Sequence, residues 1–532
     1  MDKHLSFSRL LIFLFLTSLF LISSCGPSHE ERTAEIDQLR TQAETLITIQ
    51  SEMGWDNWVF GKQSNQDSLY KEHGGLFTVD NITLLRKTEE EEPDPIQRKR
   101  LHYFRRYLTT EYIAKSIAPL TDSVSNLEAS LTVTIDGREV PYRQVNGMIA
   151  VETDQDARAD MYRALDPALD SLNTILTRVE AMYQALSAAL GYSSYNAMIH
   201  DLKGIDPEQF RVTCEEVLEK TEKSYLDLLK VQLAAFPGLS MEDFYRYDTG
   251  PLFRSARFSP FFPADAMLPT AGKTLAGMGI DLDALPNLHI DAEPREQKNP
   301  RAVCFPVSVP TDVRLSIKPN GGADDFMALF HELGHGLHFA STTEHAVEFK
   351  YMGEPTTTET YAFLLEYLVA NQAWLRQMTS MPARQLKEFV GLQAFRRLYY
   401  IRRYSAKFLY EYHLHTGMPA PENAYSELLS RATAYQEIPS DSKRYLTDLD
   451  PLYYSAGYLR AWFLEAQLSG TMADRFGANW YESRDAGEFL RILWAQGDRL
   501  NGDELAESLG FDHVSPEPLI ALIDAMVLFS TP

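Results

Sequence analysis

Apolar residues recur every three or four positions along most of this chain, and this spacing predicts a mainly α-helical protein. The pattern places leucine, isoleucine and aromatic residues on one face of each segment, as in helices that pack around a core. Helices are expected at about residues 34–52, 96–125, 156–191, 207–233, 324–340, 357–377, 384–415 and 452–470.

Alternating apolar and polar residues predict only a few strands. Residues 131–140 alternate around an Asp-Gly dipeptide that is typical of tight turns, so we expect a β-hairpin near 131–151. Two further strands are expected at 302–307 and 313–317, shortly before the helix at 324–340. The pattern therefore predicts a small β-sheet beside that helix.

The helix expected at 324–340 separates its residue types by face. Its apolar face is formed by Phe326, Leu329, Phe330, Leu333, Leu337 and Ala340, while His331, His335 and His338 share the opposite face. Residues four apart lie above one another on a helix, so His331 and His335 can bind one metal ion, and zinc favours nitrogen ligands. Glu332 is placed to accept a proton from water activated by that metal. The alternative is an amphipathic helix whose solvent-facing side carries histidines without a metal.

A catalytic zinc site needs a third protein ligand and an open position for water. The metzincin pattern requires glycine at 338 and histidine at 341, but the chain has His338 and Ser341 there, so this class is excluded. A carboxylate from the next helix is the remaining source, and Glu359 is the first candidate. The other candidates are Glu366, Glu348 and His345. Thr356-x-x-Glu359 also fits a capping box, in which Glu359 would cap its own helix instead.

Three segments carry the most distinctive residues of the chain. They are residues 312–322, the run His331-Glu332-Leu333-Gly334-His335-Gly336-Leu337-His338, and Thr358-Glu359 followed by Ala362 and Glu366. Together they resemble the thimet-oligopeptidase family of zinc peptidases, which includes oligoendopeptidase F and dipeptidyl carboxypeptidase. The resemblance implies one zinc ion per chain, held by His331, His335 and Glu359, with Glu332 as general base. It also implies that Glu366 orients a ligand. His338 matches a histidine that often follows the motif, and we expect it to support a ligand or to pack nearby rather than bind the metal.

The same resemblance implies the fold and further site residues. The expected fold is a large, mainly α, two-lobed peptidase of the gluzincin type, with a deep central channel and a small β-sheet beside the zinc-binding helix. Residues 453–459 are similar to a tyrosine-rich segment of this family, whose phenols stabilise the oxyanion. Tyr458 is the first candidate for this role and Tyr454 the second. The histidine that better-known members place before these tyrosines is absent from residues 446–451.

The first residues of the chain predict export and lipid attachment. A basic start and an apolar stretch at 10–22 are typical of a signal peptide, which we expect at residues 1–24. Residues 21–25 resemble a bacterial lipobox, which implies cleavage before Cys25, lipidation of its sulfur and a tether at residues 25–33. We expect a cell-envelope protein anchored in the outer membrane and facing the periplasm, with exposure at the cell surface as an option. An ordinary signal peptide with a coincidental cysteine is the alternative.

Charge and cysteine content narrow the function classes. The chain has 532 residues and a formal net charge of −24, which argues against a nucleic-acid partner. After processing, only Cys214 and Cys304 remain, too few for a disulfide scaffold or a cysteine zinc site. The length allows an N-terminal helical region at 34–202 and a metallopeptidase catalytic region at 203–532. We expect a monomer.

The metal-site residues together with this resemblance imply a zinc-dependent oligopeptidase, and the channel that the resemblance implies would admit short or unfolded peptides. One rival is a zinc carboxypeptidase or dipeptidyl carboxypeptidase, which needs a cation near the site for the substrate's C-terminus. The other rival is a catalytically inactive, lipid-anchored peptide-binding protein, against which the intact Glu332 argues. Four arginines are expected on a solvated or ion-paired helix face, with a clamp for a substrate carboxylate as the alternative. They are Arg396, Arg397, Arg402 and Arg403.

Overall fold

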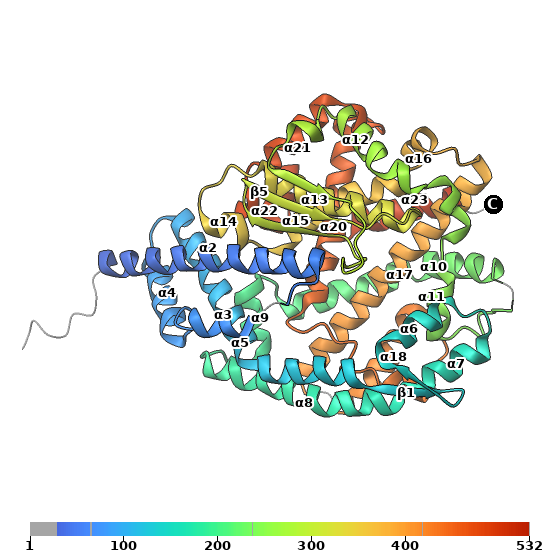
Figure 1. The fold of residues 1–532 in the computed structure, drawn as a ribbon, viewed down its shortest axis with the longest axis horizontal. Helices are drawn as coiled ribbons and strands as arrows, with labels where there is room; N and C mark the ends of the chain where they lie inside the picture. The colour runs from blue at the N-terminus through green and yellow to red at the C-terminus, as the bar shows by residue number, and fades with distance from the viewer. Residues whose placement is uncertain (1–28, 64–65, 237, 418, 531–532) are drawn as a thin grey trace, which may run out of the picture.

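The computed structural model describes residues 29–63, 66–236, 238–417 and 419–530. Helices form most of this chain, which confirms the fold class predicted from the spacing of apolar residues. They are arranged in an upper and a lower lobe in the view of Figure 1. Two long helices, α10 (Pro207–Ala234) and α17 (Ala383–His415), lie between the lobes.

The N-terminal part of the chain supplies the left and lower parts of the molecule in Figure 1. Its elements are α2 (His29–Phe60), α3 (Gln66–Glu72), α4 (Val79–Glu91), α5 (Pro95–Ser130), β1 (Thr132–Ile135), β2 (Arg138–Pro141), α6 (Tyr142–Val151), α7 (Gln155–Ala164), α8 (Asp166–Ala189) and α9 (Tyr195–Lys203). β1 and β2 form the predicted antiparallel hairpin. The hairpin ends at Pro141, and α6 fills the rest of the segment that we assigned to it.

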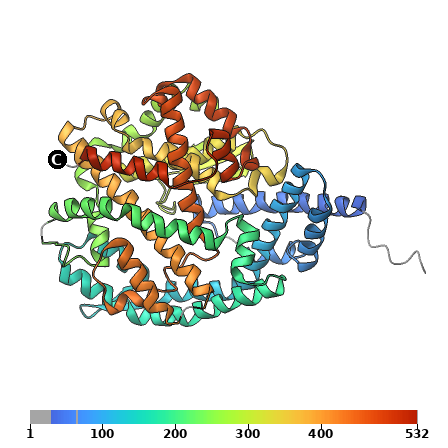
Figure 2. The same cartoon turned by 180° about the vertical axis from the view of Figure 1, so that it is seen from behind.

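The C-terminal part supplies the upper lobe and also α11 and α18 of the lower one, with α19 packed against α18. Its elements are α11 (Thr249–Leu252), α12 (Met267–Gly277), β3 (Leu288–Asp291), β4 (Val303–Ser308), β5 (Asp312–Ser316), α13 (Ala323–Ser341), α14 (Val347–Tyr351), α15 (Pro355–Glu366), α16 (Gln372–Met378), α18 (Pro421–Thr433), α19 (Pro439–Ser442), α20 (Tyr454–Phe476), α21 (Arg484–Trp494), α22 (Gly502–Leu509) and α23 (Glu517–Ser530). Figure 2 shows α23 lying beside α10 on the back of the molecule.

The three-stranded sheet has the order β3-β5-β4 and lies against α13. β3 is parallel to β5, and β4 is antiparallel to it, so β4 is an edge strand among the described strands. The sequence predicts β4 and β5 but not β3, which is only four residues long and pairs with a strand more than twenty residues away. The small sheet expected beside the histidine-bearing helix is therefore confirmed, with one strand added.

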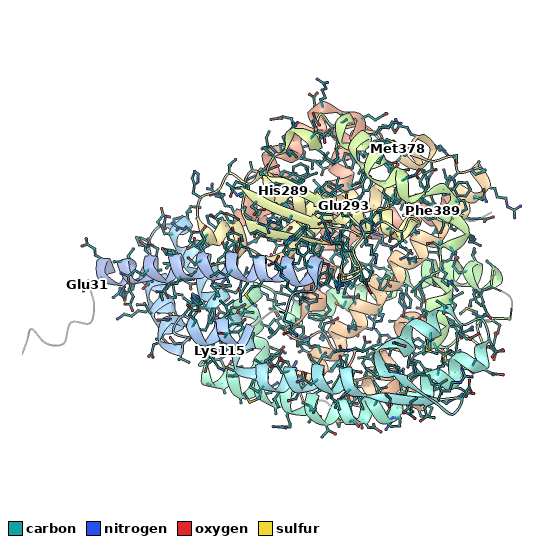
Figure 3. The ribbon with its side chains drawn as sticks, in the orientation of Figure 1. Glu31, Lys115, His289, Glu293, Met378 and Phe389 are labelled. Atoms are coloured by element: carbon teal, nitrogen blue, oxygen red, sulfur yellow. The ribbon has the colours of Figure 1, made fainter. Side chains whose placement is uncertain are left out.

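Apolar side chains form a continuous core through both lobes of the described chain. It includes Leu202 and Ile205, so it continues across the boundary that we expected between residues 202 and 203. Phe389 of α17, labelled in Figure 3, illustrates the packing, because its ring centroid lies 5.1 Å from that of Phe258 and 5.4 Å from that of Phe262. A smaller apolar cluster joins the hairpin to α6, α7 and Tyr247.

Two expected helices are interrupted, and proline explains one of the breaks. The helix expected at 156–191 is divided at Leu165, because Pro167 lies at the start of α8 and lacks the amide that a continuous helix would need. The helix expected at 357–377 becomes α15, a short 3-10 segment at Tyr367–Ala370 and α16. Asn371 caps α16 by accepting hydrogen bonds from the amides of Ala373 and Trp374.

The described chain begins with α2, which is described from His29. The last residues of the segment that we assigned to a tether are therefore helical, with Glu30 and Glu31 in the first turn, where the helix dipole favours acidic residues. The expected signal peptide at 1–24 and Cys25 lie outside the described residues. Among the helices that are described, none has the length and apolar content needed to cross a membrane.

Candidate metal centre

A tight turn places α13 at the edge of the sheet. Asp325 accepts hydrogen bonds from the amides of Asn320 and Gly321, at 2.6 and 3.0 Å, and so fixes the turn to the helix that follows. Gly321 has a φ of +84°, and a Cβ there would lie 2.9 Å from the Ala264 amide nitrogen, so only glycine fits. The predicted apolar face of α13 is buried along its whole length, which leaves His331 and His335 on the side toward α15.

Gly334 lets α13 and α15 approach closely. A Cβ at this position would lie 2.5 Å from both the Tyr361 carbonyl oxygen and the Ala362 Cα, distances that no real side chain tolerates. The two helices therefore pack backbone against backbone at this point. As a result, a residue near the start of α15 faces the two histidines of α13, and that residue is Glu359.

His331, His335 and Glu359 form one cluster with the geometry of a metal site. The Glu359 Oε2 atom lies 3.5 Å from His331 Nε2 and 3.8 Å from His335 Nε2, and all three atoms lie within 4.8 Å of one another. Ligand atoms around a tetrahedral zinc ion lie about 3.3–3.5 Å apart, given bond lengths of about 2.0–2.1 Å. Glu359 Oε2 is buried without a hydrogen-bond partner in the described chain, as expected of an oxygen that binds an ion. These residues therefore fit a zinc ion.

The outer nitrogen of each histidine is held by a side chain of α15. His331 Nδ1 lies 2.8 Å from Glu366 Oε2, and His335 Nδ1 lies 2.8 Å from Thr358 Oγ1. When each Nδ1 carries the proton, each Nε2 presents its lone pair toward Glu359, which is the tautomer that a metal needs. Glu366 thus has the position that the resemblance implies. Sequence reasoning missed Thr358, although it directly precedes Glu359.

Burial and neighbouring charges set the protonation of this cluster. Burial disfavours a charged ring, but the hydrogen bond and charge of Glu366 outweigh it and raise the pKa of His331 to about 9. Burial raises the pKa of Glu359 to about 7 and lowers the pKa of His335 well below its usual value. Without a metal, the pair His331 and Glu359 therefore holds protons that a bound cation would displace.

Glu332 lies beside the ligands but outside the three-residue cluster. Burial raises the pKa of its carboxyl group, and the backbone amide of Cys304 in β4 donates a hydrogen bond to it. The side chain is half-buried, so it remains accessible to a small molecule. A carboxylate held in this way, with a pKa above its usual value, suits a general base.

The two candidate tyrosines lie on the first turns of α20, next to the cluster. Tyr454 donates a hydrogen bond of 3.2 Å to the hydroxyl of Tyr458. Burial, together with the Glu359 carboxylate, raises the pKa of Tyr458, which therefore stays protonated and able to donate. Glu359, Tyr454 and Tyr458 all line one cavity of about 320 Å³, which we call the α5–α20 cavity. The structure thus brings both tyrosines to the same space as the predicted third ligand.

The other candidates for the third ligand have different surroundings. Glu348 is completely buried and accepts hydrogen bonds from Arg40 and Arg100, while His345 is exposed. The capping-box interpretation of Glu359 is wrong, because α15 begins at Pro355 and the Glu359 side chain makes no capping bond. Proline at the helix start needs no amide partner, so the helix begins one residue before the threonine.

His338 and the cysteines do not join the cluster. His338 is completely buried between the rings of Phe339 and Tyr361, and burial lowers its pKa to about 4, so it is a neutral packed residue. Cys214 and Cys304 are both free thiols. Burial raises the pKa of each thiol well above its usual value, which keeps them unreactive.

The arginines of α17 all have partners in the described chain. Arg396 pairs with Asp324, Arg397 with Glu465 and Arg403 with Asp448. Arg402 donates to the backbone carbonyls of Leu218 and Ala432. The ion-paired interpretation of this helix face therefore holds for Arg396, Arg397 and Arg403.

Comparison with known proteins supports the fold. The chain is similar to the crystal structure of a protein from Chlamydophila abortus described as a "putative peptidase", with a TM-score of 0.68 over 94% of this chain and 91% of that chain. The two sequences are 14% identical, so the similarity shows that the two chains share a fold. No family model matches this sequence, and no curated protein matches it either.

Proposed function

We propose that this protein is a zinc-dependent peptidase that hydrolyses short or unfolded peptides. The observation that carries the proposal is the cluster of His331, His335 and Glu359, with an unpartnered Glu359 oxygen facing two histidine nitrogens. The shared fold with a protein described as a peptidase supports the same reaction class. The position of Glu332 beside this cluster favours an active enzyme over an inactive binding protein.

The residues of the site would divide the reaction among them. His331, His335 and Glu359 would hold the zinc, which when bound polarises the scissile carbonyl and lowers the pKa of water. Glu332 would take the proton of the attacking water and pass it to the leaving amine. Tyr458, kept protonated by burial, would donate a hydrogen bond to the oxyanion, and Tyr454 would orient the Tyr458 hydroxyl.

The edge strand β4 offers a place for an extended peptide. Cys304 is opposite Leu315 of β5, but its amide points away from β5 and donates to Glu332, so the free edge of β4 faces the candidate base. Pro306 is on the same edge and lacks an amide, as is common where no strand pairs. A substrate backbone could add to this edge as a further strand and bring its scissile bond to Glu332.

A peptidase assay with metal removal tests the proposal. The protein is incubated with a mixture of internally quenched peptides, with and without a chelator, and zinc is then restored. We expect hydrolysis that the chelator abolishes and that about one equivalent of zinc recovers. No hydrolysis by the zinc-loaded protein, or hydrolysis that a chelator leaves unchanged, contradicts the proposal.

We also propose that the chain is a lipoprotein of the bacterial cell envelope. The support is the sequence of residues 1–25, with an apolar stretch that ends in a lipobox-like cysteine. A lipid-anchored peptidase in the outer membrane would meet oligopeptide substrates in the periplasm or at the cell surface.

A further inference from the structure

The chain enters α20 through a backbone conformation that side chains rarely adopt, at residues 452–453, which we call the α20 turn. Leu452 has a φ of +60° and Tyr453 a φ of +49°, both in the left-handed region that favours glycine. Within the described residues, no other two neighbouring non-glycine residues share this conformation. Tyr454 follows directly, and Tyr458 lies one turn further along α20. The direction of these two candidate tyrosines therefore depends on how the α20 turn is held.

Two buried side chains bind the backbone amides of the α20 turn. The Leu452 amide donates a hydrogen bond of 2.7 Å to the hydroxyl oxygen of Tyr195, and the Tyr453 amide donates one of 2.8 Å to Glu411 Oε1. The Tyr195 hydroxyl in turn donates to the same Glu411 oxygen at 3.2 Å. Tyr195 and Glu411 are both buried, so an amide that lost its acceptor here would remain unpaired. Glu411 therefore holds one amide directly and the other through Tyr195.

The two partners of the turn come from helices that are distant in sequence. Tyr195 begins α9 and Glu411 lies near the end of α17, which packs against both α9 and α20. The Tyr453 ring is buried 4.8 Å from that of Phe408, and its hydroxyl donates a hydrogen bond of 2.8 Å to Asn196. These side-chain contacts explain why a tyrosine occupies a position whose backbone favours glycine. The contacts from α9 and α17 thus offset the unfavourable backbone conformation of the turn.

The charged and titratable groups around Glu411 leave the turn-holding oxygen to its two donors. His415 Nε2 lies 3.9 Å from Glu411 Oε1, beyond hydrogen-bond distance, and burial lowers the pKa of His415 to about 3, so its ring is neutral. Burial raises the pKa of Glu411, and the charges of Glu180 and Lys203 shift it in opposite directions. An uncharged carboxyl or amide oxygen can also accept both hydrogen bonds. The turn therefore needs an oxygen acceptor at position 411 rather than a charge.

We propose that Glu411 and Tyr195 are positioning residues, which hold the α20 turn so that the candidate tyrosines face the metal site. Leu452 and Tyr458 line the α5–α20 cavity together with Glu359, whereas Glu411 and Tyr195 do not. A movement of the turn would therefore displace the wall beside the candidate ligand without any loss of a group that contacts the substrate. The inference rests on the proposed function, in which the tyrosines stabilise the oxyanion, and it adds the residues that place them.

A double-mutant cycle tests whether Glu411 acts through the tyrosines. Glu411→Leu removes the acceptor and should lower kcat for a quenched peptide about 10- to 100-fold, with KM and zinc content unchanged, because a transition-state contact is misplaced. Glu411→Gln keeps an oxygen acceptor and should retain most of the wild-type kcat. Tyr195→Phe removes a single hydroxyl and should lower kcat by a smaller factor. In a Tyr454→Phe/Tyr458→Phe background, Glu411→Leu should have no further effect, because the phenols that it positions are absent.

Tyr410→Phe is the matched control. Tyr410 is a buried tyrosine that precedes Glu411 on α17, and its hydroxyl has no hydrogen-bond partner in the described chain, so its removal should leave kcat unchanged. If Glu411→Leu does not fold, Tyr195→Phe replaces it in the cycle. A crystal structure of the variant used gives a measurement that does not depend on activity. The α20 turn should leave the left-handed region in this structure, and the Tyr458 hydroxyl should move.

The outcomes separate this inference from the proposed function. If the zinc-loaded wild-type protein hydrolyses no peptide, the proposed function is wrong and the inference falls with it. If the wild type is active and Glu411→Leu lowers kcat by the same factor with and without the two phenols, Glu411 has a general structural role and the proposal is overturned. A wild-type kcat in Glu411→Leu, or a crystal structure with the α20 turn and the Tyr458 hydroxyl unmoved, overturns it as well.

Discussion

The orientation of the two candidate ligand histidines depends on residues that do not themselves face the metal position. Glu366 holds the Nδ1 of His331 and Thr358 holds the Nδ1 of His335, both from the neighbouring helix α15. Such contacts fix which ring nitrogen carries a proton. Glu359 is a candidate ligand and Glu366 orients His331, whereas Glu332 does neither. Glu332 is therefore free to act on a water molecule beside the ligands.

Replacement of Glu332 by glutamine separates metal binding from catalysis. Because Glu332 lies outside the ligand cluster, Glu332→Gln should bind zinc with the wild-type stoichiometry. Loss of the general base should lower kcat by about 10²- to 10⁴-fold. Zinc content and hydrolysis of a quenched peptide measure the two effects, with Glu427→Gln, at an exposed position of α18, as the control. Full activity of Glu332→Gln would exclude this residue as the base.

The buried carboxyl group of Asp498 should make the free energy of unfolding depend on pH, whether or not a metal is bound. Burial raises the pKa of its carboxyl group to about 7, against 3.8 for an ordinary aspartate. Between these values the unfolded chain loses the proton and the folded chain keeps it. The protonated carboxyl therefore stabilises the folded protein at low pH by about 4 kcal/mol, and this contribution is lost as the pH rises from about 4 to about 7.

Asp498→Asn should remove most of this dependence, since an amide cannot ionise and can still accept from the Gly353 amide. Relative to the wild type, the variant should gain stability on going from pH 5 to pH 8. Urea unfolding at both values measures the free energy of unfolding, with the exposed Asp122→Asn as the control. An identical pH profile for Asp498→Asn and wild type would show that Asp498 is ionised in the folded protein.

The sequence predicts the site residues unevenly. His331, Glu332 and His335 lie within five positions on one helix, so their relation follows from helical spacing alone. Glu359 and Glu366 come from a helix that reaches α13 only through tertiary packing, so spacing left several alternatives open. Thr358 carries no local signal, because its role depends on a contact with His335 of another helix.

At the scale of single elements, the contact between α13 and α15 determines whether the site forms. Gly334 is the residue that allows it, because a Cβ would meet the backbone of Tyr361 and Ala362 at 2.5 Å. Alanine in the interior of a helix is normally favourable relative to glycine by about 0.5–1 kcal/mol. Here the helices would have to separate, and Glu359 would move away from the histidines.

Gly334→Ala should therefore destabilise the protein by about 1–3 kcal/mol and weaken zinc binding. Gly470→Ala in α20 is the matched control, since a Cβ there meets nothing within 4 Å and the change should be neutral or stabilising. Chemical denaturation and a chelator competition assay measure the two effects. Wild-type stability and zinc affinity in Gly334→Ala would show that the close contact does not set the site.

Helices with strong local signals are predicted best. The helix predicted at 384–415 matches α17 to within one residue, because apolar residues recur at helical spacing along its whole length. The division of 357–377 into α15 and α16 is not predicted, because the chain bends there to cover the core and no glycine or proline marks the bend. Local pattern identifies an element more reliably than its ends.

At the scale of the whole molecule, the two lobes enclose the α5–α20 cavity. Residues of α5 and α9 form one side and residues of α15 and α20 the other, so an intact site needs both halves of the chain. The sequence predicts two lobes only through the resemblance to a peptidase family. The cavity itself depends on residues more than 200 positions apart, which no local pattern relates.

The predicted lipid anchor also belongs to this scale. Replacement of Cys25 by serine should prevent incorporation of labelled fatty acid and release the protein from the membrane fraction. Because Cys25 is far in sequence from the candidate metal centre, the zinc-dependent activity of the released protein should be unchanged. Equal incorporation of labelled fatty acid by Cys25→Ser and wild type, or no incorporation by the wild type, would contradict lipidation at this residue.

The most direct test of the central claim is a crystal structure of the zinc-loaded protein with anomalous diffraction data at the zinc edge. The account predicts one strong anomalous peak per chain, about 2.0–2.2 Å from His331 Nε2, His335 Nε2 and a Glu359 carboxylate oxygen. A peak elsewhere, or no peak between these three side chains, would contradict it.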